Sequence, residues 1–513
     1  MSFTSRRAGG LAGLSFIATT GLLGAYLGYP GLRKAQAATT CTVTTADDAG
    51  AGSLRQCLLD TASGTITFDP SVTDTIALSS DLPQVTLTSS LTITGNGTEN
   101  TRINGRENSV FDFAGNHTVS ISGLTVENGY VDNASLGGGG AIYSESGNVT
   151  ITDSRFEGND AYINGGAIHA KDGSVTITGS IFTSNSTYFS GGAISAESIS
   201  VTNSTFTGNT STTSGAGGAL FTDGGAMTVN DSTFRNNSAY YRGGAIDAYR
   251  GEVTVTGSTF VGNSSSGDGG AIGTLLGSAN IRVISSTFTG NSAVRGGAIF
   301  AQNAGSSVAV SFSTVSGNTT SGGSSGALHA VGSLSVTNSI VSNASGGDVQ
   351  GASVTLSYSL LGTYAGTVPS SVIVGEDPLL GALADNGGPT QTMMPGAGSP
   401  VLGAANPAGA PATDQRGYTR TTNGRADMGA VERLGVPPTS DPSQVPPSWH
   451  QAQGRQQQES VCPPGMAPSW AQWPNEGTGG WTCEWTTWWD VNEGVGGGWV
   501  TTPGFRAGRI PGL

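Results

Sequence analysis

The side chains that could perform chemistry recur at one-repeat intervals in the middle of this 513-residue sequence. His169 stands in one copy of the repeat, and Glu197 and Asp223 stand two residues beyond the same position in the next two copies. Hydrolysis of a glycosidic bond requires two carboxyl groups at a defined separation, and elimination requires a base, commonly beside a Ca²⁺ site rich in Asp and Glu. If the protein is a polysaccharide hydrolase or lyase, these three residues are therefore the catalytic candidates.

Two columns of outward-facing residues would carry these groups if the copies stack in register. The first column is Tyr143, His169, Ser195, Phe221, Asp247, Gly273, Phe300 and His329. The second is Glu145, Lys171, Glu197, Asp223, Tyr249, Leu275, Gln302 and Val331. The residue types change from copy to copy and carboxylates are sparse, as on a solvated wall. We therefore favour a wall with no catalytic residue, no metal site and no cofactor, although its scattered aromatic side chains would suit a sugar chain.

The copies that must position these residues contain two motifs, the first with a spacing of 26 residues. The alanine of Gly-Gly-Ala-(Ile/Leu) lies at Ala141, Ala167, Ala193, Ala219, Ala245 and Ala271, with degenerate copies at Ala298 and Ala327. The aromatic residue of Phe-x-x-Asn lies at Phe156, Phe182, Phe206, Phe234, Phe260 and Phe288, and is replaced by Val315 and Ile340 in the last two copies. Its asparagine lies at Asn159, Asn185, Asn209, Asn237, Asn263, Asn291, Asn318 and Asn343. A fixed period of this length is typical of a solenoid.

Each copy consists of short strands separated by turns. Segments such as 149–151 and 175–177 alternate apolar and polar residues, and Gly, Asn and Asp interrupt them. Short strands with no helix between them can wind into a coil in which each strand pairs with the same strand one turn later. We therefore predict an all-β fold, a right-handed parallel β-helix. In it the Phe residues form an internal column, the Asn amides bond across coils and the Gly pair forms a tight corner.

The remaining sequence divides into an export signal and several smaller regions. Residues 1–37 are predicted to be a signal peptide, because Arg6 and Arg7 precede an apolar run and a small-residue cleavage site ends at Ala37. The route, general secretory or twin-arginine, stays open, and a retained membrane anchor is the alternative. No other stretch could span a membrane. We place an N-terminal cap at 38–62, the β-helix at 63–376 with regular repeats at about 139–343, a C-terminal cap at 377–433, a Pro- and Gln-rich linker at 434–460 and a small Trp-rich module at 461–513.

Four cysteines lie as two close pairs near opposite ends of the chain. Export permits disulfides, and of the three possible pairings proximity favours Cys41–Cys57 and Cys462–Cys483. Neither pair has zinc-site spacing with histidines.

The Trp-rich module contains Trp470, Trp473, Trp481, Trp485, Trp488, Trp489 and Trp499. The second disulfide would staple so small a unit. Either the tryptophans form its small core, or some of them stack on sugar rings or cell-wall glycan; contact with a membrane interface is a third alternative.

The densest charged set of the chain lies in the C-terminal cap and comprises Asp414, Arg416, Arg425, Asp427 and Glu432. Opposite charges this close indicate an ion-paired cap over the last coil rather than a site.

The paired motifs of residues 139–343 resemble the repeat of the polymorphic outer-membrane proteins, in which it builds a right-handed β-helix, often on an adhesin. Segment 51–72 resembles the start of large secreted bacterial β-helix proteins, with Cys57 in place of the usual Ala. Segments 377–404 and 413–432 resemble a choice-of-anchor domain, which implies a role at the cell envelope and no chemistry. About eighty residues follow Glu432, too few for the membrane barrel of the polymorphic family, so autotransport is excluded.

The sequence thus predicts a secreted, envelope-associated bacterial protein, a non-catalytic adhesin or envelope-interaction protein. The alternatives are a β-helix polysaccharide lyase or hydrolase and a structural envelope or sheath component. The expected partners are cell-wall glycan, a polysaccharide, or a host or neighbouring surface. The formal charge of −14 disfavours nucleic acid. The oligomeric state does not follow from the sequence.

Overall fold

The computed structural model describes residues 39–132, 137–275, 279–322, 326–421 and 424–433, and the backbone of 466–472 and 479–485. The predicted signal peptide at 1–37 and the linker at 434–460 lie outside these residues. No helix in the described part of the chain is long and apolar enough to cross a bilayer.

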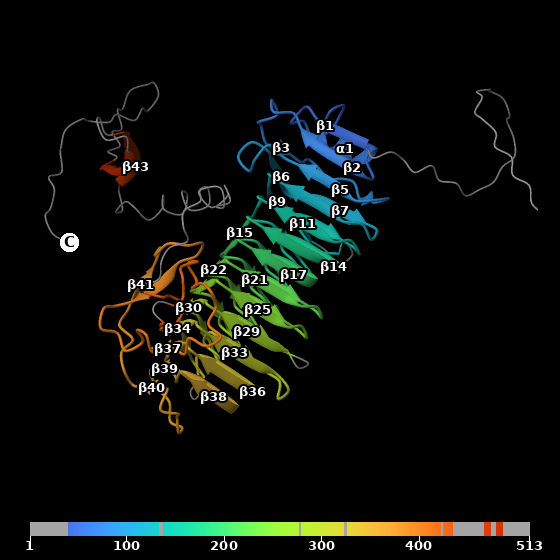
Figure 1. Cartoon of the computed structure of the whole chain (residues 1–513). Helices are drawn as coiled ribbons and strands as arrows, with labels where there is room; N and C mark the ends of the chain where they lie inside the picture. Colours follow the sequence, from blue (N-terminus) through green and yellow to red (C-terminus); the bar gives the residue numbers. More distant parts are fainter. Residues whose placement is uncertain are drawn as a thin grey trace, which may run out of the picture. The chain divides into compact units, whose positions relative to one another are not determined.

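The fold is a parallel β-solenoid in which the strands of successive coils stack one on the next (Figure 1). The longest ladder takes one long or two short strands from each coil: β1 (Thr39–Val43), β2 (Gly64–Phe68), β4 (Val85–Thr86), β5 (Leu91–Thr94), β7 (Phe111–Ala114), β8 (Val119–Ser122), β10 (Ile142–Ser144), β11 (Val149–Thr152), β14 (Ile168–Thr178), β17 (Ile194–Thr202), β20 (Leu220–Thr222), β21 (Met227–Asn230), β24 (Ile246–Ala248), β25 (Val253–Thr256), β28 (Ile272–Thr274), β29 (Asn280–Ile284), β32 (Ile299–Ala301), β33 (Ser307–Ser311), β36 (Leu328–Thr337) and β38 (Val349–Ser357).

Two further ladders run beside the first. The second ladder contains β3 (Ile76–Ala77), β6 (Arg102–Asn108), β9 (Thr125–Val131), β12 (Arg155–Glu157), β15 (Ile181–Thr183), β18 (Thr205–Thr207), β22 (Thr233–Arg235), β26 (Thr259–Val261), β30 (Thr287–Thr289), β34 (Thr314–Ser316), β37 (Ile340–Ser342), β39 (Leu360–Leu361) and β40 (Ile373–Val374). The third begins at the end of β9 and contains β13 (Asp160–Ala161), β16 (Ser186–Thr187), β19 (Thr210–Ser211), β23 (Ser238–Ala239), β27 (Ser264–Ser265), β31 (Ser292–Ala293) and β35 (Thr319–Thr320). All pairings within these ladders are parallel, so the predicted parallel β-helix is confirmed.

The Gly-Gly-Ala motif forms the corner between the third ladder and the first. The first glycine has positive φ, +62° at Gly165, a conformation that L side chains rarely adopt. The second must approach the next coil closely, because a Cβ on Gly166 would lie 2.2 Å from the carbonyl oxygen of Gly192. Ala167, which follows, is fully buried.

The interior carries the predicted Phe column. The rings of Phe156, Phe182, Phe206, Phe234, Phe260 and Phe288 are buried and stack with centroids 4.6–4.9 Å apart and planes within 7°. Val315 continues the column, but the next member is Val341 and not Ile340 as we expected from the spacing. Asn343 is accordingly exposed, and the buried Asn column ends at Asn318.

The buried asparagines form a continuous hydrogen-bond ladder. The Oδ1 atom of Asn237 accepts from both the backbone N–H and the Nδ2 of Asn209, each at 2.9 Å. Its own Nδ2 donates to the carbonyl of Phe206 at 3.0 Å and to Oδ1 of Asn263 at 2.9 Å. Each amide therefore satisfies backbone groups of the corner between the second and third ladders.

A second polar ladder runs parallel to the first and was missed by the sequence analysis. It comprises Ser154, Ser180, Ser204, Ser232, Ser258, Ser286, Ser313, Ser339 and Ser359, all buried. The backbone N–H of Ser232 donates to the hydroxyl of Ser258, and the Ser232 hydroxyl donates to the carbonyl of Asn230. The signal was present as a serine two residues before each ladder phenylalanine.

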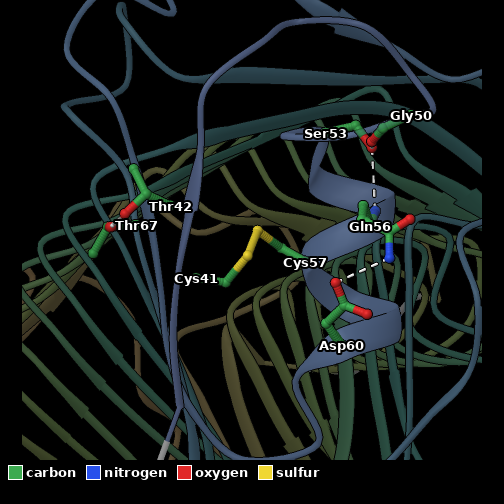
Figure 2. Close-up of a disulfide and its surroundings, with 8 residues drawn as sticks. All are labelled: Cys41, Thr42, Gly50, Ser53, Gln56, Cys57, Asp60 and Thr67. Carbon is green, nitrogen blue, oxygen red and sulfur yellow. Dashed lines mark hydrogen bonds between the residues drawn. A yellow bond between two sulfur atoms is a disulfide. The ribbon is translucent and has the colours of Figure 1, made fainter.

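Both ends of the solenoid are closed by chain segments. At the start, helix α1 (Leu54–Asp60) buries Leu54 and Leu58 and begins at Ser53, whose hydroxyl accepts from the N–H of Gln56. The disulfide Cys41–Cys57 ties β1 to this helix, as predicted (Figure 2). At the other end, Tyr364, Val368 and Val372 of the segment after β39 pack against the main core.

The Asn ladder yields a prediction about stability. Asn237→Ala leaves buried donors on Asn209 and a buried carbonyl on Phe206 without partners, so we expect the stability to fall by about 3 kcal/mol. Urea titration followed by circular dichroism measures the change. Asn116→Ala, at an exposed turn, is the matched control and should change stability by less than about 0.5 kcal/mol. Equal behaviour of the two variants would contradict the assigned role.

Candidate functional site

The first predicted column exists in the structure with the predicted register. Tyr143 pairs with His169, His169 with Ser195 and Phe221 with Asp247 across successive strands of the longest ladder. The column continues through Gly273 and Phe300 to His329.

Most of this column does not face solvent, which corrects our expectation of an outward wall. His169 is 8% exposed, and Asp247 and Phe300 are fully buried. The cause is the chain leading into each Gly-Gly corner, which folds over the neighbouring strand. A Cβ on Gly138, for example, would lie 2.9 Å from Nδ1 of His169.

His169 is therefore poorly placed for proton transfer to a polymer. Burial lowers the pKa of its imidazole, so the ring is neutral at physiological pH. Its Nδ1 contacts the carbonyl oxygen of Gly137, which can only accept, so the proton lies on Nδ1. The ring also packs against Tyr143 at a centroid distance of 5.7 Å.

The other two candidates lie apart from this imidazole. Glu197, in β17, and Asp223, directly after β20, are exposed on successive coils, whereas His169 is covered. The structure thus places the three residues on adjoining coils but does not assemble them into an acid–base pair around one accessible point.

The sequence analysis missed an acidic cluster at the N-terminal end of the same column. Asp112 pairs in register with Tyr143, and both of its carboxylate oxygens accept from Nε2 of Gln84, at 3.2 and 3.0 Å. Burial and the nearby Glu145 raise the pKa of Asp112, and the same two causes raise the pKa of Tyr143. The signal was hidden because Asp112 precedes the regular repeats and matches neither motif. In the described residues, no group of three or more His, Cys, Asp or Glu side chains is arranged to hold a metal ion.

A buried ion pair occupies the centre of the column. Nε and Nη2 of Arg242 donate to the two carboxylate oxygens of Asp247 at 2.6 and 2.9 Å, and the side chains are 2% and 0% exposed. Burial raises the pKa of Asp247, opposed by the charge of Arg242. The arginine stem fits because its neighbour is Gly273, where a Cβ would lie 2.3 Å from Cγ of Arg242.

The charged segment at 414–432 was expected to cover the last coil, and this expectation is wrong. Residues 377–433, which include the antiparallel strands β41 (Leu380–Ala384) and β42 (Thr392–Pro395), pack along the sides of several coils instead. Figure 1 shows this segment beside the stacked coils, and Gln391, directly before β42, accepts a hydrogen bond through Oε1 from Nη2 of Arg235 in β22 at 2.6 Å. The reason is that Phe312, Ile340 and Leu360 face outward and form a small core with Val401, Ala405, Ala426 and Met428.

Hydrogen bonds fix this lateral domain to successive coils. Oε1 of Gln415 accepts from the Thr287 hydroxyl at 2.6 Å, and its Nε2 donates to the Thr259 hydroxyl at 2.9 Å. The backbone N–H of Ala430 donates to the Thr314 hydroxyl at 3.0 Å. These hydrogen bonds hold the domain at a fixed position along the solenoid.

The charged set does hold an ion pair, between Arg416 and Asp414 at 2.8 Å, but its centre is Arg420, which the sequence analysis did not single out. Arg420 is fully buried, donates to the carbonyls of Gly429 and Ala430, and lies 4.8 Å from the ring centroid of Phe312. Burial lowers its pKa to about 10.

The remaining members of the set differ in exposure. Arg425 is exposed, whereas Asp427 and Glu432 are buried. Burial, with the nearby charges of Asp427 and Asp414, raises the pKa of Glu432 to about 7, opposed by Arg420. These groups hold the lateral domain together and leave no open reaction site.

The Trp-rich module is described only as a backbone hairpin of β43 (Met466–Gln472) and β44 (Gly479–Trp485). Trp470 and Trp481 are paired in its antiparallel register. Trp473, Trp488, Trp489, Trp499 and Cys462 lie outside the described residues, so the predicted second disulfide and the role of the tryptophans stay predictions.

A strip of exposed aromatic side chains follows the third ladder and was not anticipated. This aromatic strip consists of Tyr130, Tyr162, Tyr188, Phe189, Tyr240 and Tyr241, which are 37–56% exposed. The rings of Tyr162 and Tyr188 stack at 5.2 Å, and Phe189 packs edge-on against both. The signal, an aromatic pair a few residues before Gly-Gly, is present in only two of the copies.

The fold agrees with a family model that matches the regular repeats. Residues 139–311 match the family model described as right handed beta helix region. This description fits cell-surface proteins and proteins that act on polysaccharides, and it gives the coil the predicted hand. No curated protein matches the chain. The likenesses to polymorphic outer-membrane proteins and to a choice-of-anchor domain therefore stay predictions.

The buried ion pair yields a prediction. Arg242→Met or Asp247→Leu alone leaves an unpaired buried charge, so each should lower stability by about 4 kcal/mol. The double variant should lose much less than the sum, as a thermal-unfolding double-mutant cycle would show. The pair Arg295–Asp268, whose side chains are 44% and 15% exposed, is the more accessible control, and Arg295→Met should cost less than about 1 kcal/mol. Additive losses at Arg242 and Asp247 would contradict the pairing.

Glu432 yields a prediction about pH. Because its folded pKa lies above the ordinary value of 4.5, the native state binds the extra proton between about pH 4.5 and 7. The stability it contributes is therefore complete below this window and is lost as the pH rises through 7. Glu432→Gln, which can still accept from the N–H of Asp427, should raise stability at pH 8 by about 2 kcal/mol and leave it unchanged at pH 4.5.

Denaturant titrations at the two pH values measure this difference. Glu376→Gln, at an exposed position, is the control and should change stability little at either pH. A gain for Glu432→Gln that is the same at both pH values would count against the protonation argument.

Proposed function

We propose that this protein is an exported, non-catalytic binding protein of the bacterial cell envelope, an adhesin in the broad sense. The observation that carries the proposal is the aromatic strip, an ordered row of exposed rings on a wall whose strands are rich in Ser and Thr. Exposed aromatic side chains held in fixed positions are typical of binding surfaces, because they supply large contact areas with little loss of side-chain entropy.

Two further features support the proposal. The disulfide Cys41–Cys57 is expected in an oxidising compartment, which agrees with the predicted signal peptide. The column that would have carried catalysis is closed over at His169, so a polymer lying on the wall would not reach that imidazole.

The second candidate function is cleavage of a polysaccharide, and the cluster of Asp112, Tyr143 and Glu145 favours it. A carboxyl group with a raised pKa beside a second carboxylate is the arrangement that glycoside hydrolysis uses. In this structure Asp112 is engaged by Gln84, and we give the cluster a structural role.

Binding and turnover can be measured in one experiment. Purified chain beginning at residue 38 is incubated with isolated bacterial envelopes and with soluble polysaccharides, and both co-sedimentation and released sugar ends are quantified. We expect saturable binding without release, unchanged in Asp112→Asn. Sugar release that Asp112→Asn abolishes would establish the enzyme instead, and absence of binding to every envelope would overturn the proposed function.

A further inference from the structure

We propose that the aromatic strip, together with the cavity at its N-terminal end, binds a neutral polysaccharide chain that runs across the coils. The inference rests on the proposed binding function and assigns it a surface and a ligand class. It is independent of the Trp-rich module.

The cavity opens where the strip begins. It has a volume of about 670 Å³ and is lined by Asn104, Arg106, Glu107, Asn128, Tyr130 and Asp160, among others. Tyr130 lines the cavity and lies on the coil before Tyr162, in register with Asp160 and therefore two residues along the strand from the column of Tyr162 and Tyr188. Its lining sets one aromatic ring beside the amide, guanidinium and carboxylate groups of Asn104, Arg106 and Asp160, which can form hydrogen bonds to a polar ligand.

A local irregularity of β6 creates this cavity. The pairing of β6 with β9 shifts between Asn104 and Asn108, so that Arg106 and Glu107 bulge out of the ladder with φ of +47° and +67°. The side chain of Asn104 holds the bulge by accepting from the N–H of Arg106 at 2.9 Å. Bulges of this kind re-aim side chains beside functional sites.

The strip continues from the cavity with the spacing of the coils. Tyr162 and Tyr188 directly follow β13 and β16, and Tyr240 follows β23. Their rings therefore recur at one and then two strand separations, about 5 and about 10 Å. A polymer of hexose rings advances by a similar distance per unit, so successive sugars would meet successive coils.

The coil between Tyr188 and Tyr240 lacks an aromatic ring but offers hydroxyl groups. Thr212 stands in register between the two tyrosines, and the exposed Thr213 and Ser214 follow it. Aromatic rings that alternate with hydroxyl groups suit a sugar, because a sugar presents C–H groups to the rings and its own hydroxyls to the protein hydroxyls. The Thr212 hydroxyl already donates to the carbonyl of Thr187 at 3.2 Å, and a purely apolar partner would bury the exposed hydroxyls of Thr213 and Ser214 without offering them a hydrogen bond.

The charges of this surface select a neutral ligand. Arg106, Glu107 and Asp160 give the cavity a formal charge of −1, and the whole chain carries −14. Beside Tyr241, Arg242 lies 5.5 Å from the ring centroid, but its charge is buried against Asp247. An acidic polysaccharide would be repelled, whereas carboxylates can accept hydrogen bonds from neutral sugar hydroxyls.

Affinity electrophoresis tests the proposal with the whole mature chain. Native gels contain a neutral glucan, galactomannan or xylan, or the acidic polygalacturonate, and retardation gives the dissociation constant. We expect retardation by at least one neutral polysaccharide. Tyr130→Ala and Tyr188→Ala should each weaken it about tenfold. Tyr358→Ala, a tyrosine of similar exposure outside the strip, is the matched control and should bind like the parent.

The other outcomes overturn the inference in distinguishable ways. Envelope binding without retardation by any neutral polysaccharide would refute the ligand class while leaving the proposed function intact. Retardation that neither tyrosine substitution weakens would refute the surface. A change of oligomeric state in Tyr188→Ala, seen by light scattering, would mean that the strip binds a second copy of the chain.

Discussion

The structure depends on the requirement that every coil find its hydrogen-bond partners in the coils on either side. A single turn of this chain has no interior of its own, because its strands pair only with equivalent strands of neighbouring turns. The Asn and Ser ladders extend that dependence to the corners, where the backbone leaves the sheets and would otherwise bury unpaired groups. The Phe column fills the space between, at the spacing that the strands impose. Composition follows from this constraint: small, polar and β-branched residues dominate because each position must fit directly above a near copy of itself.

The same constraint explains which features of the fold could be predicted from the sequence. A motif that repeats at a fixed interval has to serve the contact between copies, so Gly-Gly-Ala and Phe-x-x-Asn predicted the coil, its corner and its interior columns. The N-terminal disulfide followed from proximity. Register failed at Ile340: this isoleucine stands three residues before Asn343 and so matched the motif, but Val341, one residue later, takes the interior position opposite Val315. Ser53 and Gln56 indicate the start of helix α1, but the helix lies outside the repeats and could not be predicted from their spacing.

Exposure could not be predicted in the same way. Whether His169 or Asp247 faces water depends on how the chain before each Gly-Gly corner folds back, and that path is set by residues which differ from copy to copy. The lateral position of residues 377–433 was equally hidden, because it depends on outward apolar residues such as Phe312 that break the pattern of their own coils. Departures from the repeat therefore indicate where the candidate sites lie. The bulge at Arg106, the tyrosines of the aromatic strip and the coil residues that contact the lateral domain are all found where one copy differs from the next.

The lateral domain has a consequence for how such a chain can change in length. Its hydrogen bonds run from Arg235 to Asn338 and its apolar contacts reach Leu360, so duplication or loss of a coil within that span would separate Gln415 or Ala430 from its partner. The coils that carry Tyr162 and Tyr188 lie before the span and bear none of these contacts. Recombination between repeats that share the two motifs can therefore lengthen or shorten the aromatic strip while the lateral domain keeps its position on the later coils. The molecule is divided into a part whose number of turns is fixed and a part whose number of turns is free to vary under selection.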